Sequence, residues 1–305
     1  MEVLVSQIFT GLSIASILLL IALGLAIIYG TMGVINLAHG ELVMLGAYSS
    51  WFLQSTFGLS LVPSLFVVFL MVGFAGWLIE RGIVRFLYNR PMDTILATWG
   101  IGIMLQQGIR IVAGAELRYV ELPKYLGHSI DVLGINLSVY RLFILLITVL
   151  LLGLTWFLLF RTEFGAKLRA VTQNKEMAEC YGIDSQKIYA TTFAFGAGLA
   201  GVAGALVAPI KSVSPDMGVN FVVDAFMVVV VGGIGSVIGT AAAAMILGEL
   251  TAGFAFLLND TLAKAIVFLA VVVLIRFRPQ GLFVLLVRKW GRSEERRVGE
   301  MGGWG

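Results

Sequence analysis

Long apolar runs that are almost free of charge constrain this chain more than any other feature. Over residues 1–79 the only formally charged side chains are those of Glu2 and Glu41. A water-soluble domain normally carries about a quarter charged residues, whereas this chain of 305 residues carries 13% and is 59% hydrophobic. Most of its surface must therefore face lipid, and the sequence predicts an all-α, polytopic bundle of transmembrane helices.

The expected crossings follow from length, because a spanning helix needs about 20 mostly apolar residues with every backbone group bonded internally. The clearest segments are 7–29, 61–79, 94–113, 139–160 and 189–208. After Asn220 an apolar stretch with short breaks adds 221–231, 238–257 and 262–275. Segment 42–54 is short, and fits a tilted span or a re-entrant piece. The sequence thus predicts about eight or nine spans, with Gly-interrupted helices in two halves.

Basic residues indicate which end of the bundle is cytoplasmic. Three clusters, within 81–90, 161–187 and 276–297, hold 15 of the 21 Lys and Arg residues. Because cytoplasmic loops carry the excess of Lys and Arg, an alternating topology places all three clusters inside the cell. Loops 114–138 and 210–220 are then external. The first apolar run lacks the basic start of a signal peptide and is too long for one, so we expect a retained span.

The domain organisation predicted is simple. Residues 1–290 form a single transmembrane domain with a cytoplasmic loop at about 161–188, and the polar, Gly-rich residues 291–305 form a disordered cytoplasmic tail. The one cysteine, Cys180, excludes a disulfide framework, and no His/Cys cluster predicts a metal or cofactor. The chain has no GxxxxGK[ST] motif of its own for ATP. Its basic residues do not share one soluble face, so no nucleic-acid partner is expected.

Two glycine-rich stretches, 29–41 and 230–240, interrupt the helical pattern at similar places in the two halves. Glycine weakens a helix, and freed backbone groups are tolerated at membrane depth only beside protein or a water-filled cavity. Paired interruptions are typical of a transporter's substrate path. Close helix packing through small residues, which explains 196–204, is the alternative. The placement also suggests a weak parallel repeat of about three helices.

Polar residues near the first interruption are candidates for a substrate path. An ionisable side chain such as Glu41 costs roughly 2.5–3.5 kcal/mol at a helix centre, and less if the interruption lies at the inner interface. A His beside a Glu also occurs at hydrogen-bonded helix starts, so a structural role is the alternative for His39. The candidates are Asn36, His39, Glu41, Thr98, Gln106 and Gln107.

The cytoplasmic loop contains a further pattern. Residues 174–181 predict a short amphipathic helix that Gly182 ends, which would cover lipid headgroups or dock a soluble partner. The spacing Glu176-x-Ala178-x-x-x-Gly182 resembles the coupling-loop motif of ABC importer permeases, the segment that docks into an ATPase groove. Two features depart from that motif: Met177 replaces its second Ala, and its downstream Ile-x-Leu-Pro is absent.

Several longer strings resemble the branched-chain amino acid permease family over roughly residues 7–285. They are residues 161–170 with Gly182-Ile-Asp184, and segments 33–41, 232–236 and 278–283. Within that family, 90–100 and 259–264 are most similar to the urea-transporting branch. The resemblance implies a permease subunit, not itself an enzyme, of an ABC importer in a bacterial inner membrane that moves urea or a related short-chain amide into the cytoplasm.

The same resemblance implies partners and alternatives. The partners are a second related permease subunit, two cytoplasmic ABC ATPases, an extracytoplasmic substrate-binding protein and membrane lipid; Glu176, Ala178 and Gly182 take the ATPase-coupling role. Urea is neutral and hydrogen-bonds in both directions, so amide and hydroxyl groups suit it. A branched-chain amino acid, whose charged groups need partners such as the ends of broken helices, is the alternative substrate. An ATP-independent facilitator or channel is a further alternative.

Overall fold

The computed structural model shows a polytopic helical bundle. It describes residues 2–88, 90–132, 135–278 and 281–282. The long helices of this described part are α1 (Glu2–Met32), α2 (His39–Phe57), α3 (Leu61–Gly82), α4 (Pro91–Ala113), α5 (Val139–Arg161), α8 (Ser185–Val207), α9 (Met217–Gly232), α10 (Val237–Leu257) and α11 (Asp260–Phe277). Between them lie η1 (Val84–Phe86), α6 (Glu163–Gln173), α7 (Lys175–Cys180) and an antiparallel hairpin of β1 (Ser129–Val132) and β2 (Ile135–Ser138).

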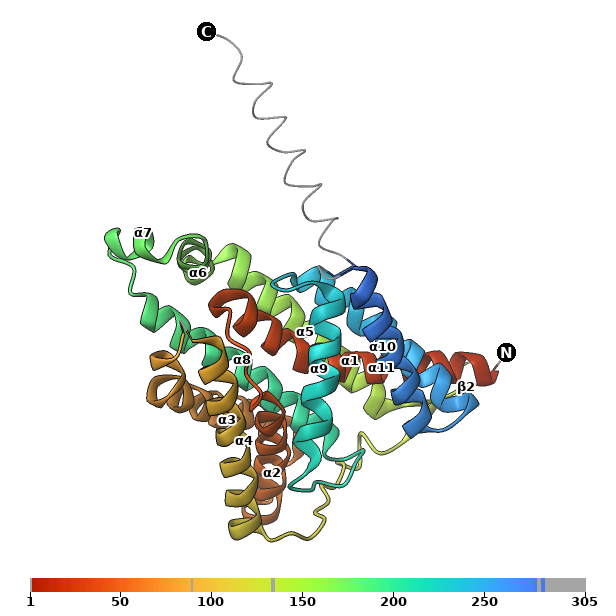
Figure 1. Cartoon of the computed structure of the whole chain (residues 1–305). Helices are drawn as coiled ribbons and strands as arrows, with labels where there is room; N and C mark the ends of the chain where they lie inside the picture. The colour runs from red at the N-terminus through yellow and green to blue at the C-terminus, as the bar shows by residue number, and fades with distance from the viewer. Residues whose placement is uncertain (1, 89, 133–134, 279–280, 283–305) are drawn as a thin grey trace.

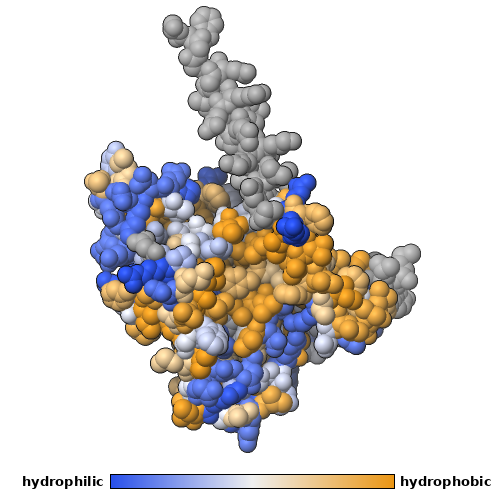
Figure 2. Space-filling model, viewed as in Figure 1, coloured by the Kyte–Doolittle hydropathy of each residue, from blue (hydrophilic) through white to orange (hydrophobic). Residues whose placement is uncertain are grey.

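Within the described residues, six helices are long and apolar enough to cross a membrane: α1, α3 together with η1, α4, α5, α8 and α10. Helix α9 is apolar but has 16 residues. Helix α11 is apolar but carries three charged residues among its 18, which are Asp260, Lys264 and Arg276. Helix α2 is less apolar and carries His39 and Glu41. All nine predicted segments therefore form helices, and six of these helices are by themselves long and apolar enough to cross a membrane. Figure 2 shows the apolar band across one face, with hydrophilic residues at both ends.

Helices α1 and α8 form the centre of the bundle. Helix α1 crosses its middle (Figure 1) and packs against α5, α8, α9 and α10, while α8 also packs against α2 and α3. A Cβ atom on Gly196 of α8 would lie 2.7 Å from the carbonyl oxygen of Gly24 in α1. One on Gly204 would overlap the carbonyl of Val43 in α2. The predicted close packing through the small residues of 196–204 is confirmed.

Contacts between loops place them at two opposite ends of the bundle. The backbones of Arg118 and Val213 bond to each other in both directions, at 2.9 and 2.8 Å, so the two loops predicted to be external meet. At the other end, the rings of Tyr88 and Tyr189 pack edge to face with centroids 5.0 Å apart. Tyr88 belongs to the basic-rich segment 81–90, and Tyr189 lies in α8 two residues beyond the segment 161–187, so the contact brings these two segments to the same end, as the predicted topology requires. The tail 291–305 lies outside the described residues.

The interruptions are shorter than the sequence indicated. Helix α1 continues to Met32 and α2 begins at His39, so only residues 33–38 of the predicted 29–41 are non-helical. The second interruption spans 233–236, not 230–240. Positive φ angles at Gly33 (65°) and Gly233 (90°) mark the ends of α1 and α9. Gly235, with a φ of 78°, also lies in the second interruption. The remaining glycines of these stretches are helical and lie close to the backbone of neighbouring segments: Gly30, Gly40, Gly232 and Gly239. The internal repeat stays a prediction.

Candidate functional site

The segment between α1 and α2 lies along the length of α9. At one end Gly30 packs against Gly235, just beyond the C-terminus of α9, and at the other end Gly40 packs against Gly218 in its first turn. Sixteen helical residues span about 24 Å. Residues 33–38 therefore run from the predicted cytoplasmic end of α9 towards its external end, so the interruption reaches the interior and is not confined to the inner interface.

Asn36 and His39 are completely buried in this segment. The Asn36 side-chain oxygen accepts a bond from the backbone N–H of Ala38 at 3.0 Å, which shapes the turn before α2. His39 Nε2 lies 3.0 Å from the carbonyl oxygen of Ile21 in the middle of α1. Because a carbonyl oxygen only accepts, Nε2 carries the proton in this contact. His39 thus ties the start of α2 to the centre of the bundle.

Glu41 lies in the first turn of α2, between α4 and α9. Its side chain is 6% exposed and faces Gly102 of α4 and Gly218 of α9. A Cβ atom on Gly218 would lie 2.6 Å from Glu41 Oε2, and one on Gly102 would lie 3.5 Å from Glu41 Cγ. Glycine at 218 therefore makes room for this carboxyl group.

Thr98 joins the same cluster and the two glutamines do not. Thr98 is buried, and its hydroxyl accepts a bond from the backbone N–H of Leu37 at 3.2 Å. Gln106 lies two turns further along α4 and donates to Asp216 at 2.7 Å, beside the Arg110–Asp216 ion pair. Gln107 is exposed. The structure thus brings together Asn36, His39, Glu41 and Thr98, while Gln106 extends the polar surface outward.

Several buried polar atoms of this cluster have no hydrogen-bond partner among the described residues: Asn36 Nδ2, His39 Nδ1 and Glu41 Oε2, followed by the Tyr48 and Ser50 hydroxyls along α2. Leaving a buried polar group unpaired costs about 1–3 kcal/mol. The cluster can therefore offer both donors and acceptors to water or to a polar solute. No group of three metal-binding side chains occurs in the described part of the chain.

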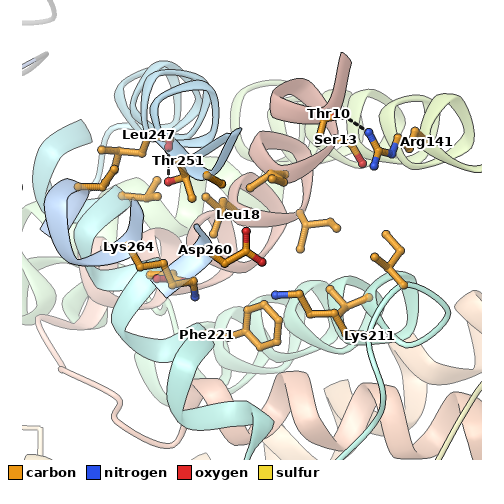
Figure 3. Close-up of a pocket in the computed structure, with 18 of the residues that line it drawn as sticks. Thr10, Ser13, Leu18, Arg141, Lys211, Phe221, Leu247, Thr251, Asp260 and Lys264 are labelled. Carbon is orange, nitrogen blue, oxygen red and sulfur yellow. Dashed lines mark hydrogen bonds and ion pairs between the residues drawn. The ribbon is translucent and has the colours of Figure 1, made fainter. Parts of the chain in front are cut away.

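A separate pocket lies on another side of α9, in the half of the bundle near the external loops. It has a volume of about 420 Å³ and is lined by α1, α5, α9, α10 and α11. Most of its wall is apolar, including Leu18 and Leu247, but charged side chains also reach it (Figure 3). These are Arg141, Lys211, Asp224, Asp260 and Lys264.

Two short helices project from the predicted cytoplasmic end, α6 and α7 (Figure 1). Side chains cap each helix of this region: Thr162 accepts from the N–H of Gly165, Asn174 from that of Met177 at 3.0 Å, and Asp184 from that of Lys187 at 3.1 Å. The bond from the Lys187 N–H lowers the pKa of the Asp184 carboxyl group. The predicted helix at 174–181 is confirmed as α7, but α6 was not predicted.

The end of α7 has the geometry of a Schellman motif. The N–H of Ile183 bonds to the carbonyl of Ala178, and the N–H of Gly182 to that of Glu179. Gly182 has a φ of 79°, and a Cβ atom there would meet nothing within 4 Å. Ala178 is buried in a cluster with Val84, Leu168 and Phe193, whereas Glu176 is exposed. Ala178 therefore anchors α7, and Glu176 faces outward.

Comparison with known proteins gives the family. Residues 7–276 match the permease component of the branched-chain amino acid transport system. The chain belongs to this permease family. No solved structure matches it. It is 30% identical to the high-affinity branched-chain amino acid permease LivH of Escherichia coli K12, and 32% identical to BraD of Pseudomonas aeruginosa; each alignment covers 96% of this chain and 97% of the relative.

A more distant relative is the permease LivM of Escherichia coli K12, which is 27% identical over 88% of this chain and 68% of the relative. Membership of the permease family confirms the resemblance drawn from the sequence motifs, and places the chain as a multi-pass protein of the bacterial inner membrane. LivH, BraD and LivM are all named for branched-chain amino acid transport. The comparisons therefore do not support the urea-transporting branch, which segments 90–100 and 259–264 had indicated.

The charged pocket of this permease was not predicted from the sequence. Asp224 is the single charged residue of α9 and stands in the apolar run 221–231, which is a signal that sequence alone contains. Asp260 and Lys264 lie near the start of the expected span 262–275, where charged residues are common. Only the fold shows that these residues and Arg141 line the same space.

Proposed function

We propose that this chain is the permease subunit of an ABC importer that moves branched-chain amino acids into the cytoplasm. The observation that carries the proposal is the match of residues 7–276 to the permease family, together with near full-length similarity to LivH and BraD. This replaces urea as the first choice of substrate. Urea is neutral, and the five charged side chains around the pocket offer it nothing that hydroxyl and amide groups would not.

Energy for transport is proposed to come from two cytoplasmic ABC ATPases that dock on α7. The exposed Glu176 would contact the ATPase, Ala178 would hold the helix against the bundle, and Gly182 would set its end. The similarity to LivM supports a second, related permease subunit as partner. An extracytoplasmic binding protein would deliver the substrate at the end of the bundle where Arg118 and Val213 meet.

The substrate path is proposed to follow the polar face formed by the 33–41 segment and α4. Asn36, His39, Glu41 and Thr98 would supply hydrogen-bonding groups at depth, and their unpartnered atoms support this role. Gln106 would extend the path outward. Gln107 is exposed on α4, and would line the path from the interface with the second permease.

Uptake by whole cells tests the proposal. Deleting the gene should abolish uptake of labelled leucine at micromolar supply and leave urea uptake unchanged, and a plasmid copy should restore the loss. Unchanged leucine uptake with lost urea uptake would reverse the choice of substrate. A facilitator would conduct solute alone, so we expect liposomes that contain only this chain to show no leucine flux without the ATPases.

A further inference from the structure

We propose that the pocket between α1, α9, α10 and α11 binds a free amino acid, with its charged head among the ionic side chains and its apolar side chain on the pocket floor. The proposal rests on the proposed function and adds a binding site to it. This site is separate from the polar cluster around Glu41, which lies on another side of α9.

The charges inside the pocket are placed where apolar residues would be expected. Asp224 and Lys264 form an ion pair of 2.7 Å, with side chains 13% and 41% exposed. Ionisable residues within membrane helices are costly and mark functional positions by default. Apolar contacts would suffice to hold α9 and α11 together, so this ion pair is a candidate for contact with a charged ligand.

Charges of both signs also stand at the mouth of this pocket. Lys211, from the loop after α8, and Asp260, from the first turn of α11, point into the pocket (Figure 3), and neither forms an ion pair within the described part of the chain. The Lys211 ammonium lies 6.0 Å from the centroid of the Phe221 ring. Arg141 approaches from α5 and donates to Thr10. A cation for a carboxylate and a carboxylate for an ammonium are thus both present.

The floor of the pocket suits an aliphatic side chain. Leu18, Val228 and Leu247 line it and are buried. The volume of about 420 Å³ falls in the range of roughly 300–1,000 Å³ typical of small-molecule sites. A zwitterion with an aliphatic side chain matches this combination of ionic mouth and apolar floor, whereas urea lacks both charge and an apolar part.

The position of the pocket also suits an intermediate binding site on the transport path into the cell. Leu122 and Lys211, which come from the two predicted external loops, are among its lining residues. At its inner side, Leu18 lies one turn of α1 before Ile21, whose carbonyl binds His39. An amino acid leaving the floor would therefore next approach the polar segment 33–41.

Photo-crosslinking tests this assignment on the importer purified with its partner subunits. A leucine analogue with a diazirine side chain should label peptides that contain 10–18, 221–228 or 247–255, and excess leucine, but not urea, should compete. Thr251→Phe fills the pocket, while Lys211→Gln and Asp260→Asn each remove one partner of the head group. Each change should lower the yield of adduct at least tenfold.

Thr191→Phe and Lys124→Gln are the matched controls, since both residues are exposed and neither lines the pocket; their labelling should equal that of the wild type. Competed adducts absent from these three segments, or unchanged in the variants, would overturn the site. So would a phospholipid that mass spectrometry finds on the wild-type importer and not on Thr251→Phe. Leucine uptake that survives gene deletion would instead overturn the proposed function itself.

Discussion

A Cβ atom on Gly30 would lie 2.6 Å from the Cα atom of Gly235, so the last turn of α1 touches the turn between α9 and α10 backbone to backbone. The two interruptions that the sequence shows in opposite halves of the chain are therefore joined at one point. No side chain separates them, and a displacement of either segment must be accommodated by the other.

Gly30→Ala should destabilise the protein, because the added methyl group collides with backbone that has no rotamer to change. Overpacking of this kind typically costs about 1–3 kcal/mol. The thermal midpoint of the purified protein in detergent should fall measurably, and leucine uptake should fall with it. Gly153→Ala in α5 is the control, since its Cβ atom meets nothing within 4 Å. Equal midpoints for the two variants would show that the contact between the interruptions is loose.

Thr98→Val should weaken the hold of α4 on the 33–41 segment. Valine has nearly the same shape, so the change removes the hydroxyl that accepts from the N–H of Leu37 and leaves that partly buried donor unpaired. The expected cost is about 1–3 kcal/mol in stability, with reduced leucine uptake. Thermal unfolding of the purified variant and leucine uptake by cells that carry it, each compared with wild type, measure both effects.

The matched control for this change is Thr191→Val in α8. Thr191 is exposed, and like Thr98 it donates to the carbonyl four residues earlier at 2.8 Å, but among the described residues it accepts no long-range bond. Little change is expected there. A loss at Thr191 as large as that at Thr98 would mean that the hydroxyl acts within its own helix and does not position Leu37.

The sequence predicted which segments are helical better than it predicted which helices meet. Apolar runs were enough to predict the spans, and basic loops were enough to predict which side of the membrane each loop faces. Asn174 and Gly182 predicted the two ends of α7. Each of these signals is local in the sequence. The interruptions were overestimated because Gly30 and Gly232 looked like helix breakers. Their role is close approach to a partner helix, which depends on contacts distant in the chain.

The candidate site shows the same limit. Asn36, His39, Glu41 and Thr98 could be named from the cost of polar groups in an apolar run, and the structure gathers them. The need for glycine at 218 cannot be read from sequence, since it arises from the Oε2 atom of Glu41 on another helix. The ionic pocket was not predicted for a similar reason: its five charged side chains come from four segments, and each of them has an ordinary local explanation.

Gly182→Val should uncouple ATP hydrolysis from transport. The φ of 79° at this position is strained for a residue with a Cβ atom, by roughly 1–2 kcal/mol, and most for a β-branched one. Open space around Gly182 means that the strain comes from its own backbone and not from a neighbour. Valine should therefore unwind the Schellman end of α7, move Glu176 relative to the ATPase, and lower leucine uptake at least tenfold while basal ATP hydrolysis continues.

Gly182→Asn separates backbone geometry from side-chain bulk, because asparagine tolerates the left-handed conformation at a helix end. We expect this variant to retain most of the uptake. Uptake and ATP hydrolysis are measured on the reconstituted importer, after co-purification shows that both variants keep their partners. Full uptake with valine, or an equal loss with asparagine, would show that the end of α7 does not transmit the motion of the ATPase.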